Sequence, residues 1–152
     1  MGGGGQQQLQ QLSQELQAID AEIEELEAEI DSLRTEQTEI DEATEAIDTL
    51  ESGSTVQVPL GGGAYVRAAV QDIDEIVVSL GGGYAAEQDQ SGATATLERK
   101  RESLDDRIAD VESEIDELES ESEQLEQQAQ QMQQQLQQQQ MQQMQQMQGE
   151  DE

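Results

Sequence analysis

The chain has 152 residues and a formal net charge of -30, with six basic residues against 36 acidic ones. This charge argues against binding to nucleic acid or anionic lipid, because both are polyanions that basic groups must neutralise. Phe, Trp, Cys and His are absent, so a disulfide framework, a thiolate nucleophile and the commonest metal ligand and general base are excluded. With Tyr65 and Tyr84 as the only aromatic residues, an elongated architecture is expected rather than a globular core.

Two interpretations of the acidity compete. A chain with few aromatic residues and high net charge can be disordered, but a folded protein from a salt-accumulating microbe carries the same bias. Sustained heptads and a single lysine, Lys100, favour the halophilic interpretation. No segment approaches transmembrane length, and the start of the chain differs from a signal peptide. We therefore expect a cytoplasmic protein that does not bind a membrane.

The first half of the chain is predicted to be mainly one helix. Residues 1–8 are rich in glycine and glutamine and are expected to be flexible. Residues 9–50 are predicted to be a coiled-coil helix, because apolar residues recur at alternating steps of three and four. These residues are Leu9, Leu12, Leu16, Ile19, Ile23, Leu26, Ile30, Leu33, Ile40 and Ile47. Turn residues from Glu51 to Ser54 end the helix.

Residues 55–87 interrupt the heptads with two predicted β-hairpins, each turning at three consecutive glycines. Pro59 in the first strand indicates an edge position. A two-stranded hairpin is marginal in water, so these strands need partners, most simply the same region of other subunits. The residues expected to mediate assembly are Val56, Val58, Leu60, Tyr65, Val66, Val70, Ile76, Val78, Leu80 and Tyr84.

The heptads return in residues 93–137, which are predicted to be a second coiled-coil helix antiparallel to the first. Placing a positions opposite d positions gives a register in which Leu12 faces Leu136 and Ile40 faces Ile108. The flanking positions are mainly acidic on both helices and repel each other. Complete pairing of the two helices is therefore expected to need molar salt, which screens this repulsion. Residues 138–152, rich in Gln and Met, are predicted to be a disordered acidic tail.

Three further motifs have simpler interpretations. The triple glycines lack the Lys-Ser/Thr and the following helix of a phosphate-binding loop, so turn glycine is the better interpretation. The dense carboxylates show no EF-hand spacing, so an acidic surface is favoured over a metal site. Arg99, Lys100, Arg101 and Arg107 form the only basic cluster. This cluster either balances neighbouring acids or contacts an acidic partner subunit.

The segments VPLGGGAYV at 58–66 and IVVSLGGGYAAE at 76–87, with Asp72 between them, resemble the linker of the prefoldin alpha subunit. The resemblance extends from Leu9 to Leu136. It implies an α+β fold: a long antiparallel coiled-coil hairpin whose two central β-hairpins assemble into an oligomeric β-barrel platform. It further implies a hexamer of two alpha and four beta subunits. The extreme acidity and the Gln/Met-rich extension depart from the family pattern.

The resemblance also implies a function. Prefoldin is an ATP-independent chaperone that captures unfolded polypeptides at its coiled-coil tips and delivers them to a group II chaperonin; it needs no cofactor. Methionine suits a surface that must adapt to many clients. The expected client contacts are Leu9, Leu12, Leu16, Met132, Leu136, Met141, Met144 and Met147. For the tail methionines the alternative is an incidental low-complexity composition.

Two other classes of function fit the sequence less well. A structural coiled-coil scaffold with a β-mediated oligomerisation node is the alternative, although a plain spacer has no need for two hairpins with open edges. An enzyme is disfavoured, because only carboxylates spread along exposed helix faces could act as catalytic groups.

Overall fold

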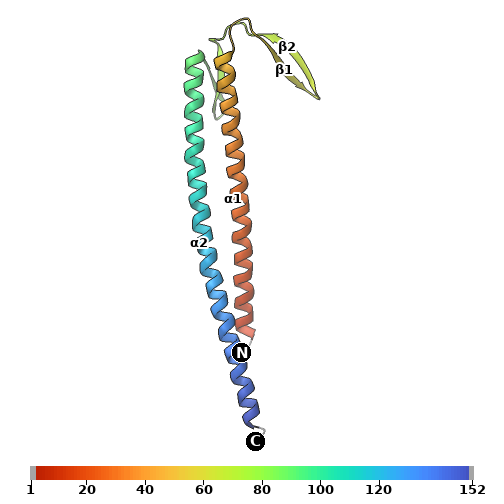
Figure 1. Ribbon diagram of the computed structural model, residues 1–152, viewed down its shortest axis with the longest axis vertical. Helices are drawn as coiled ribbons and strands as arrows, with labels where there is room; N and C mark the ends of the chain where they lie inside the picture. Colours follow the sequence, from red (N-terminus) through yellow and green to blue (C-terminus); the bar gives the residue numbers. More distant parts are fainter. Residues whose placement is uncertain (1–2, 151–152) are drawn as a thin grey trace. The chain divides into compact units, whose positions relative to one another are not determined.

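A computed structural model describes residues 3–150 as two long helices and two β-hairpins (Figure 1). The elements in chain order are α1 (Gly3–Thr49), β1 (Thr55–Gly61), β2 (Ala64–Ala69), β3 (Ile76–Gly81), β4 (Tyr84–Gln88) and α2 (Gln90–Glu150). β1 and β2 form the first hairpin, and β3 and β4 form the second. The predicted α+β class, with two hairpins between two helices, is confirmed.

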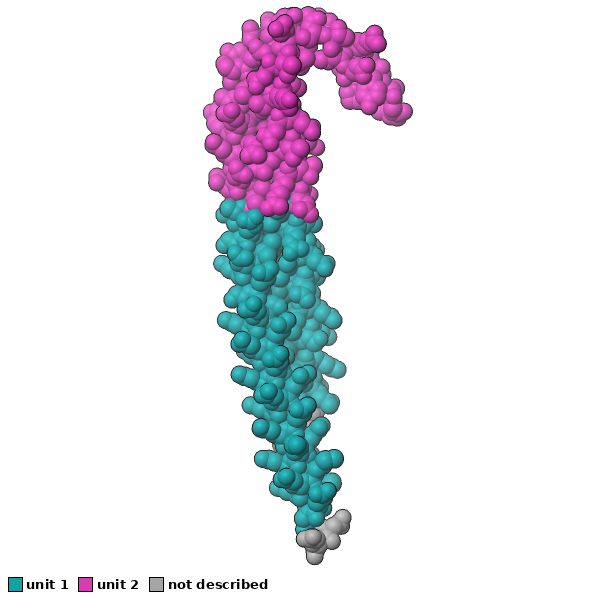
Figure 2. Space-filling view, viewed as in Figure 1, with its two compact units in different colours: residues 1–30, 109–152 teal, residues 31–108 magenta. Residues whose placement is uncertain are grey.

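The chain forms two compact units, which Figure 2 shows in different colours. Unit 1 combines residues 1–30 with 109–152, and unit 2 consists of residues 31–108 and contains both hairpins. In unit 1 the two helix segments bury an apolar seam that includes Ile19, Ile30, Val111 and Ile115. Val111 is fully buried, as expected for a heptad position of a coiled coil.

In unit 2, side chains form hydrogen bonds with backbone groups where the helices meet the hairpins. The Gln90 amide donates to the carbonyls of Ile47 (2.9 Å) and Leu50 (3.0 Å), which lie at the end of α1. Asp89 caps the start of α2, where its carboxylate accepts the Gly92 amide at 2.7 Å. Polar groups that helix ends leave unsatisfied are thereby partly paired within the chain.

The predicted helix register is wrong by about one heptad in both units. In unit 1 a Cβ at Gly5 would lie 2.7 Å from Leu136, the residue expected opposite Leu12. In unit 2 Arg101 pairs with Asp41 at 2.9 Å, although Ile40 was expected to face Ile108. A heptad is about 10 Å along a helix. The a and d positions repeat every seven residues, so the seam alone does not distinguish these two registers.

The predicted helix ends also need correction. α1 begins at Gly3 rather than at residue 9, so residues 3–8 are helical rather than flexible. α2 begins at Gln90 and continues to Glu150, so residues 138–150 are helical rather than disordered. Gln and Met are good helix formers, and no Gly or Pro interrupts α2 between Gly92 and Gly149. The predictions for residues 1, 2, 151 and 152 lie outside the described residues.

Candidate interaction surfaces

The first hairpin is exposed on both faces. Val58 pairs with Val66, and Val56 with Ala68, so these residues share one apolar face of the two-stranded sheet. Val58 and Val66 are both exposed, as are Leu60 and Tyr65. In Figure 1 the hairpin extends away from the helices of its own unit. A two-stranded sheet without a covered face has little intrinsic stability, so this hairpin has the properties of a surface that another chain covers.

Both hairpins turn in the same way. Gly62 and Gly63 form a two-residue loop with φ of 61° and 82°, and Gly82 and Gly83 match them with 62° and 81°. Two positive φ values in succession are typical of a type I′ turn, which matches the twist of the flanking strands. The register shift beside Gly61 and Gly81 adds a bulge to each hairpin. The glycine triplets are therefore turns, as predicted.

The second hairpin is packed against the helices of unit 2. Val78 is 6% exposed and forms a core with Ala93 and Leu97 of α2. Ile76 lies two residues before Val78 and therefore on the same face of β3. It packs on this core together with Ile40, Ala43 and Ile47 of α1. Hence Val78, predicted as an assembly residue, belongs to the core of its own chain.

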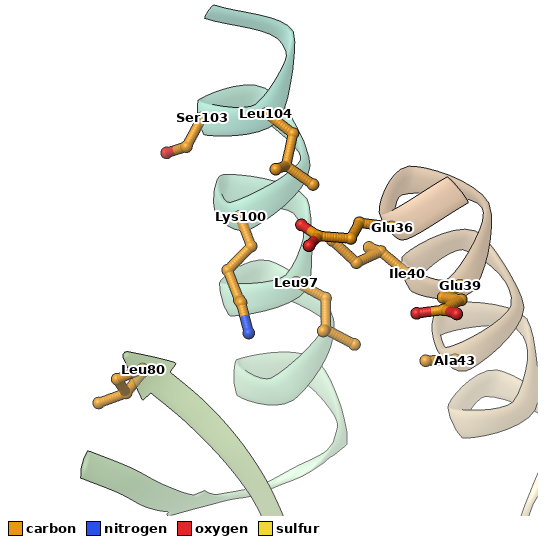
Figure 3. Close-up of a pocket in the computed structure, with 9 residues that line it drawn as sticks. All are labelled: Glu36, Glu39, Ile40, Ala43, Leu80, Leu97, Lys100, Ser103 and Leu104. Carbon is orange, nitrogen blue, oxygen red and sulfur yellow. The ribbon is translucent and has the colours of Figure 1, made fainter. Parts of the chain in front are cut away.

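Two polar contacts hold the second hairpin to α2. Lys100 Nζ donates to the Ser79 carbonyl of β3 at 2.8 Å, and the Thr96 hydroxyl donates to Gln88 of β4 at 2.8 Å. Figure 3 shows Lys100 pointing from α2 toward the end of β3. Around Lys100 lies an open hollow of about 630 Å³. It is lined by apolar side chains, Ile40, Ala43, Leu80, Leu97 and Leu104, with Glu36, Glu39 and Ser103 among its polar residues.

The structure divides the predicted assembly residues into three groups by exposure. Val58, Leu60, Tyr65, Val66, Leu80 and Tyr84 are exposed, Val56, Val70 and Ile76 are half-buried, and Val78 is buried. Sequence reasoning missed Val77, which is 68% exposed on the outer face of the second hairpin. Strand alternation could have found it, because neighbours in a strand face opposite sides, but a run of apolar residues does not show which side faces the helices.

The predicted client-contact residues lie in unit 1 and also form two groups. Leu9, Leu12, Leu16, Met132 and Leu136 are half-buried in the seam between the two helix segments. Met141, Met144 and Met147 are 66%, 71% and 74% exposed. Their spacing of three places them on one side of α2, beyond Leu136 and its contact with the first turns of α1. We call these three residues the methionine stripe.

Arg99, Lys100 and Arg101 of the basic cluster make contacts within unit 2. Arg101 binds Asp41 at 2.9 Å and lies 3.7 Å from Asp105, while Arg99 donates to Thr96 at 3.3 Å. The hydrogen bond and charge of Asp41 raise the pKa of Arg101 further above its ordinary value, so this cation keeps its charge at physiological pH. Gln37 adds a hydrogen bond of 2.6 Å to Asp105. These contacts favour local charge balance over the alternative of an acidic partner.

Other kinds of site find no support in the described part of the chain. Between residues 3 and 150, no group of three acidic side chains is arranged to hold a metal ion. No helix in the same range is apolar and long enough to cross a membrane. What remains are the hairpin surfaces and the methionine stripe, both suited to binding other polypeptides.

Comparison with known proteins agrees with this architecture. The family model described as Prefoldin subunit matches residues 19–142. Prefoldin subunit alpha of Halorubrum lacusprofundi is 74% identical over 112 residues, covering 74% of each chain. Prefoldin subunit alpha of Halobacterium salinarum is 75% identical over 111 residues, covering 73% of this chain and 72% of the relative.

A solved structure shares the fold. A chain in the cryo-EM structure of filamentous PFD from Methanocaldococcus jannaschii is 30% identical, with a TM-score of 0.51. The match covers 77% of this chain and 93% of that one. Family model, relatives and fold agree: the chain belongs to the prefoldin family, among its alpha subunits.

Proposed function

We propose that the chain is a subunit of an ATP-independent holdase, which keeps unfolded polypeptides from aggregating and delivers them to a group II chaperonin. In this proposal the hairpins join two alpha and four beta subunits through a β-barrel platform. The helices of unit 1 carry the client-binding surface. The complex works in the cytoplasm and needs no cofactor.

The methionine stripe carries the proposal. Met141, Met144 and Met147 are exposed on a part of α2 beside which unit 1 has no segment of α1 among the residues described. An unfolded client offers apolar segments of no fixed shape, and the flexible, polarizable methionine side chain adapts to such segments. Large exposed apolar side chains gathered on one side of a helix indicate an interaction surface rather than a solvated one.

The exposed hairpins support the assembly part of the proposal. The first hairpin leaves both faces open, and the second leaves Val77 and Tyr84 open. Strands from other subunits would cover these surfaces and pair with the open edges. The relative of known structure comes from filamentous PFD, an assembled form.

The holdase is tested by mixing the chain with beta subunits at high salt and measuring aggregation of a denatured client by light scattering, without nucleotide. The test variant replaces Met141, Met144 and Met147 with Gln, which preserves helix propensity. We expect about tenfold weaker suppression, because tenfold is about 1.4 kcal/mol and burying one Met gains at least as much.

A matched control replaces Gln139, Gln142 and Gln146 on the opposite side of α2 with Ala, and should suppress aggregation like the wild type. Suppression that survives in the methionine variant would remove the stripe from the client site. Absence of suppression by the wild-type complex would favour the structural scaffold instead.

A further inference from the structure

The methionine stripe places three sulfur atoms on one side of α2. Met141, Met144 and Met147 follow one another at steps of three residues, so the Cβ atoms of neighbours lie about 5–6 Å apart. With a zinc–sulfur length of about 2.3 Å as a guide, two sulfur atoms bound to one ion lie no more than about 4.6 Å apart. The methionine side chain has three rotatable bonds, so it can close this gap without a movement of the backbone. Neighbouring members of the stripe can therefore share one ion.

Met144 is the central member of the stripe. It is three residues from Met141 on one side and three from Met147 on the other, whereas these two are separated by about 9 Å along the helix axis. An open hollow of about 440 Å³ lies beside these side chains. It is lined by Gln137, Gln140, Met141, Gln143, Met144 and Met147. The three sulfur atoms thus border one space that has room for an ion.

The part of α2 that carries the stripe has no charged side chain. Between Glu126 and Glu150 the sequence contains no acidic or basic residue, although the net charge of the chain is -30. Hard cations such as Mg²⁺ and Ca²⁺ bind carboxylate oxygens, and the stripe offers them none. Zn²⁺ and iron–sulfur clusters take thiolate or imidazole ligands. Neutral thioether sulfur is a soft ligand that suits Cu(I).

No stronger soft ligand competes with the stripe. The sequence has no Cys and no His, and its two other methionines are Met1 and Met132. Met1 lies outside the described residues. Met132 is half-buried in the seam of unit 1, and it precedes Met141 by about 13 Å along the helix axis. Among the described residues, the stripe is thus where several sulfur ligands come together.

We propose that the methionine stripe is a binding site for Cu(I), with the sulfur atoms of Met141, Met144 and Met147 as ligands. The inference goes beyond the proposed holdase, because metal binding needs neither a client nor beta subunits. Binding has a structural consequence as well. The part of α2 past Leu136 extends beyond the start of α1 (Figure 1), and a short helix without a partner is marginal. An ion that joins its successive turns stabilises it.

The test measures binding of the metal alone to the isolated full-length chain. The chain is titrated calorimetrically with Ag(I), a soft monovalent ion that air does not oxidise, and then with Cu(I) kept reduced by excess ascorbate without oxygen. Molar sodium sulfate screens the acidic helices and replaces chloride, which itself binds both ions. We expect one ion per chain that a large excess of Mg²⁺ does not displace. Displacement by Mg²⁺, or no binding of Cu(I), would overturn the site.

Met144→Leu removes the central sulfur atom and keeps an apolar side chain and a good helix former. Loss of an outer-shell group alone typically lowers metal affinity by about 10-fold to 100-fold, so loss of this ligand should weaken binding about tenfold or more. A second variant combines Met144→Gln with Gln142→Met. It keeps the number of methionines, but the one at position 142 is at no step of three or four from Met141 or Met147. Its affinity should fall as far. Gln142→Met alone is the matched control and should bind like the wild type.

The spacing of the methionines decides between a site and a composition. Weaker binding in Met144→Leu and in the double variant, with unchanged binding in Gln142→Met, supports the site. Equal affinity of the double variant and the wild type would show that the number of methionines matters and their place on the helix does not, which overturns the site. As a second measurement, Ag(I) should slow amide exchange in residues 138–149 several-fold in the wild type and not in Met144→Leu. Unchanged exchange in the saturated wild type would contradict an ion that joins successive turns. A failed holdase assay would leave each of these results standing.

Discussion

Val77 and Val78 are neighbours in β3 whose side chains face opposite sides of the second hairpin. Val78 is 6% exposed and packs on Ala93 and Leu97, whereas Val77 is 68% exposed. Val78→Asp should destabilise the chain itself by about 3 kcal/mol or more, because an unpaired charge would enter a core. Thermal unfolding by circular dichroism at high salt measures this loss.

Val77→Asp is the matched substitution on the outer face. It should change unfolding by about 0.5 kcal/mol or less, since surface changes are usually small, yet lower the yield of the complex with beta subunits. Size exclusion with light scattering measures the yield. Equal thermal stability of the two variants would show that the second hairpin does not dock on α2 as described.

Lys100 is predicted to hold the second hairpin in place. Replacing it with Met keeps the apolar stem but removes the donor to Ser79, so amide exchange in β3 and β4 should accelerate several-fold. β1 and β2 serve as the internal control, since no contact of Lys100 reaches them. Lys100→Arg, which keeps a cationic donor, should restore much of the protection. Unchanged exchange in Lys100→Met would assign the docking to Val78 and Ile76 alone.

At the scale of elements, the glycine in the first turn of α2 is expected to be better than alanine, contrary to the usual preference in helices. Gly→Ala inside a helix usually stabilises by about 1 kcal/mol. At Gly92, however, a new Cβ would lie 2.8 Å from Asp89 Oδ1, the atom that caps the helix. Gly92→Ala should therefore give no gain or a loss, and Asp89→Ala should cost about 1 kcal/mol. Both are measured by thermal unfolding, with Gly4→Ala as control because open space surrounds Gly4.

The sequence predicts the hairpins closely because glycine triplets mark both turns and apolar runs flank them. It misplaces the start of α2, because Gly92 in the first turn resembles a loop residue when the Asp89 cap is not known. It misplaces the helix register, because heptads repeat and the deciding contacts are polar, such as Asp41 with Arg101. The heptads end at Leu136, so the apolar pattern does not predict the last part of α2, which instead follows from the helix propensity of glutamine.

For the candidate sites too, some features can be predicted from residue type and others depend on how the elements pack. The exposed methionines and most of the exposed apolar residues of the hairpins follow from residue type and spacing. The inward face of β3 does not, because it depends on which side the helices cover. Contacts of the second hairpin with the helices, such as those of Val78 and Lys100, fix that side.

For the whole molecule, folding is expected to depend on salt. The net charge is -30, and acidic residues dominate both helices over most of the seam. Screening shortens the reach of repulsion from about 10 Å at 0.1 M salt to about 3 Å at 1 M. Helical circular dichroism and thermal stability should both rise between low and molar KCl. A signal that is equal at the two concentrations would show that acidic repulsion does not limit the pairing of the helices.

The charge is distributed unevenly along the helices, and this bears on the proposed binding of unfolded clients. In α1 no charged residue precedes Glu15, and in α2 none lies between Glu126 and Glu150. The segments that contain Leu9, Leu12, Met132 and the methionine stripe are therefore electrically neutral in an otherwise strongly anionic chain. An unfolded polypeptide as acidic as this one would be repelled along most of the helices but not at these segments. If the chain is the proposed holdase, apolar contact rather than charge would determine how strongly these neutral segments bind a client.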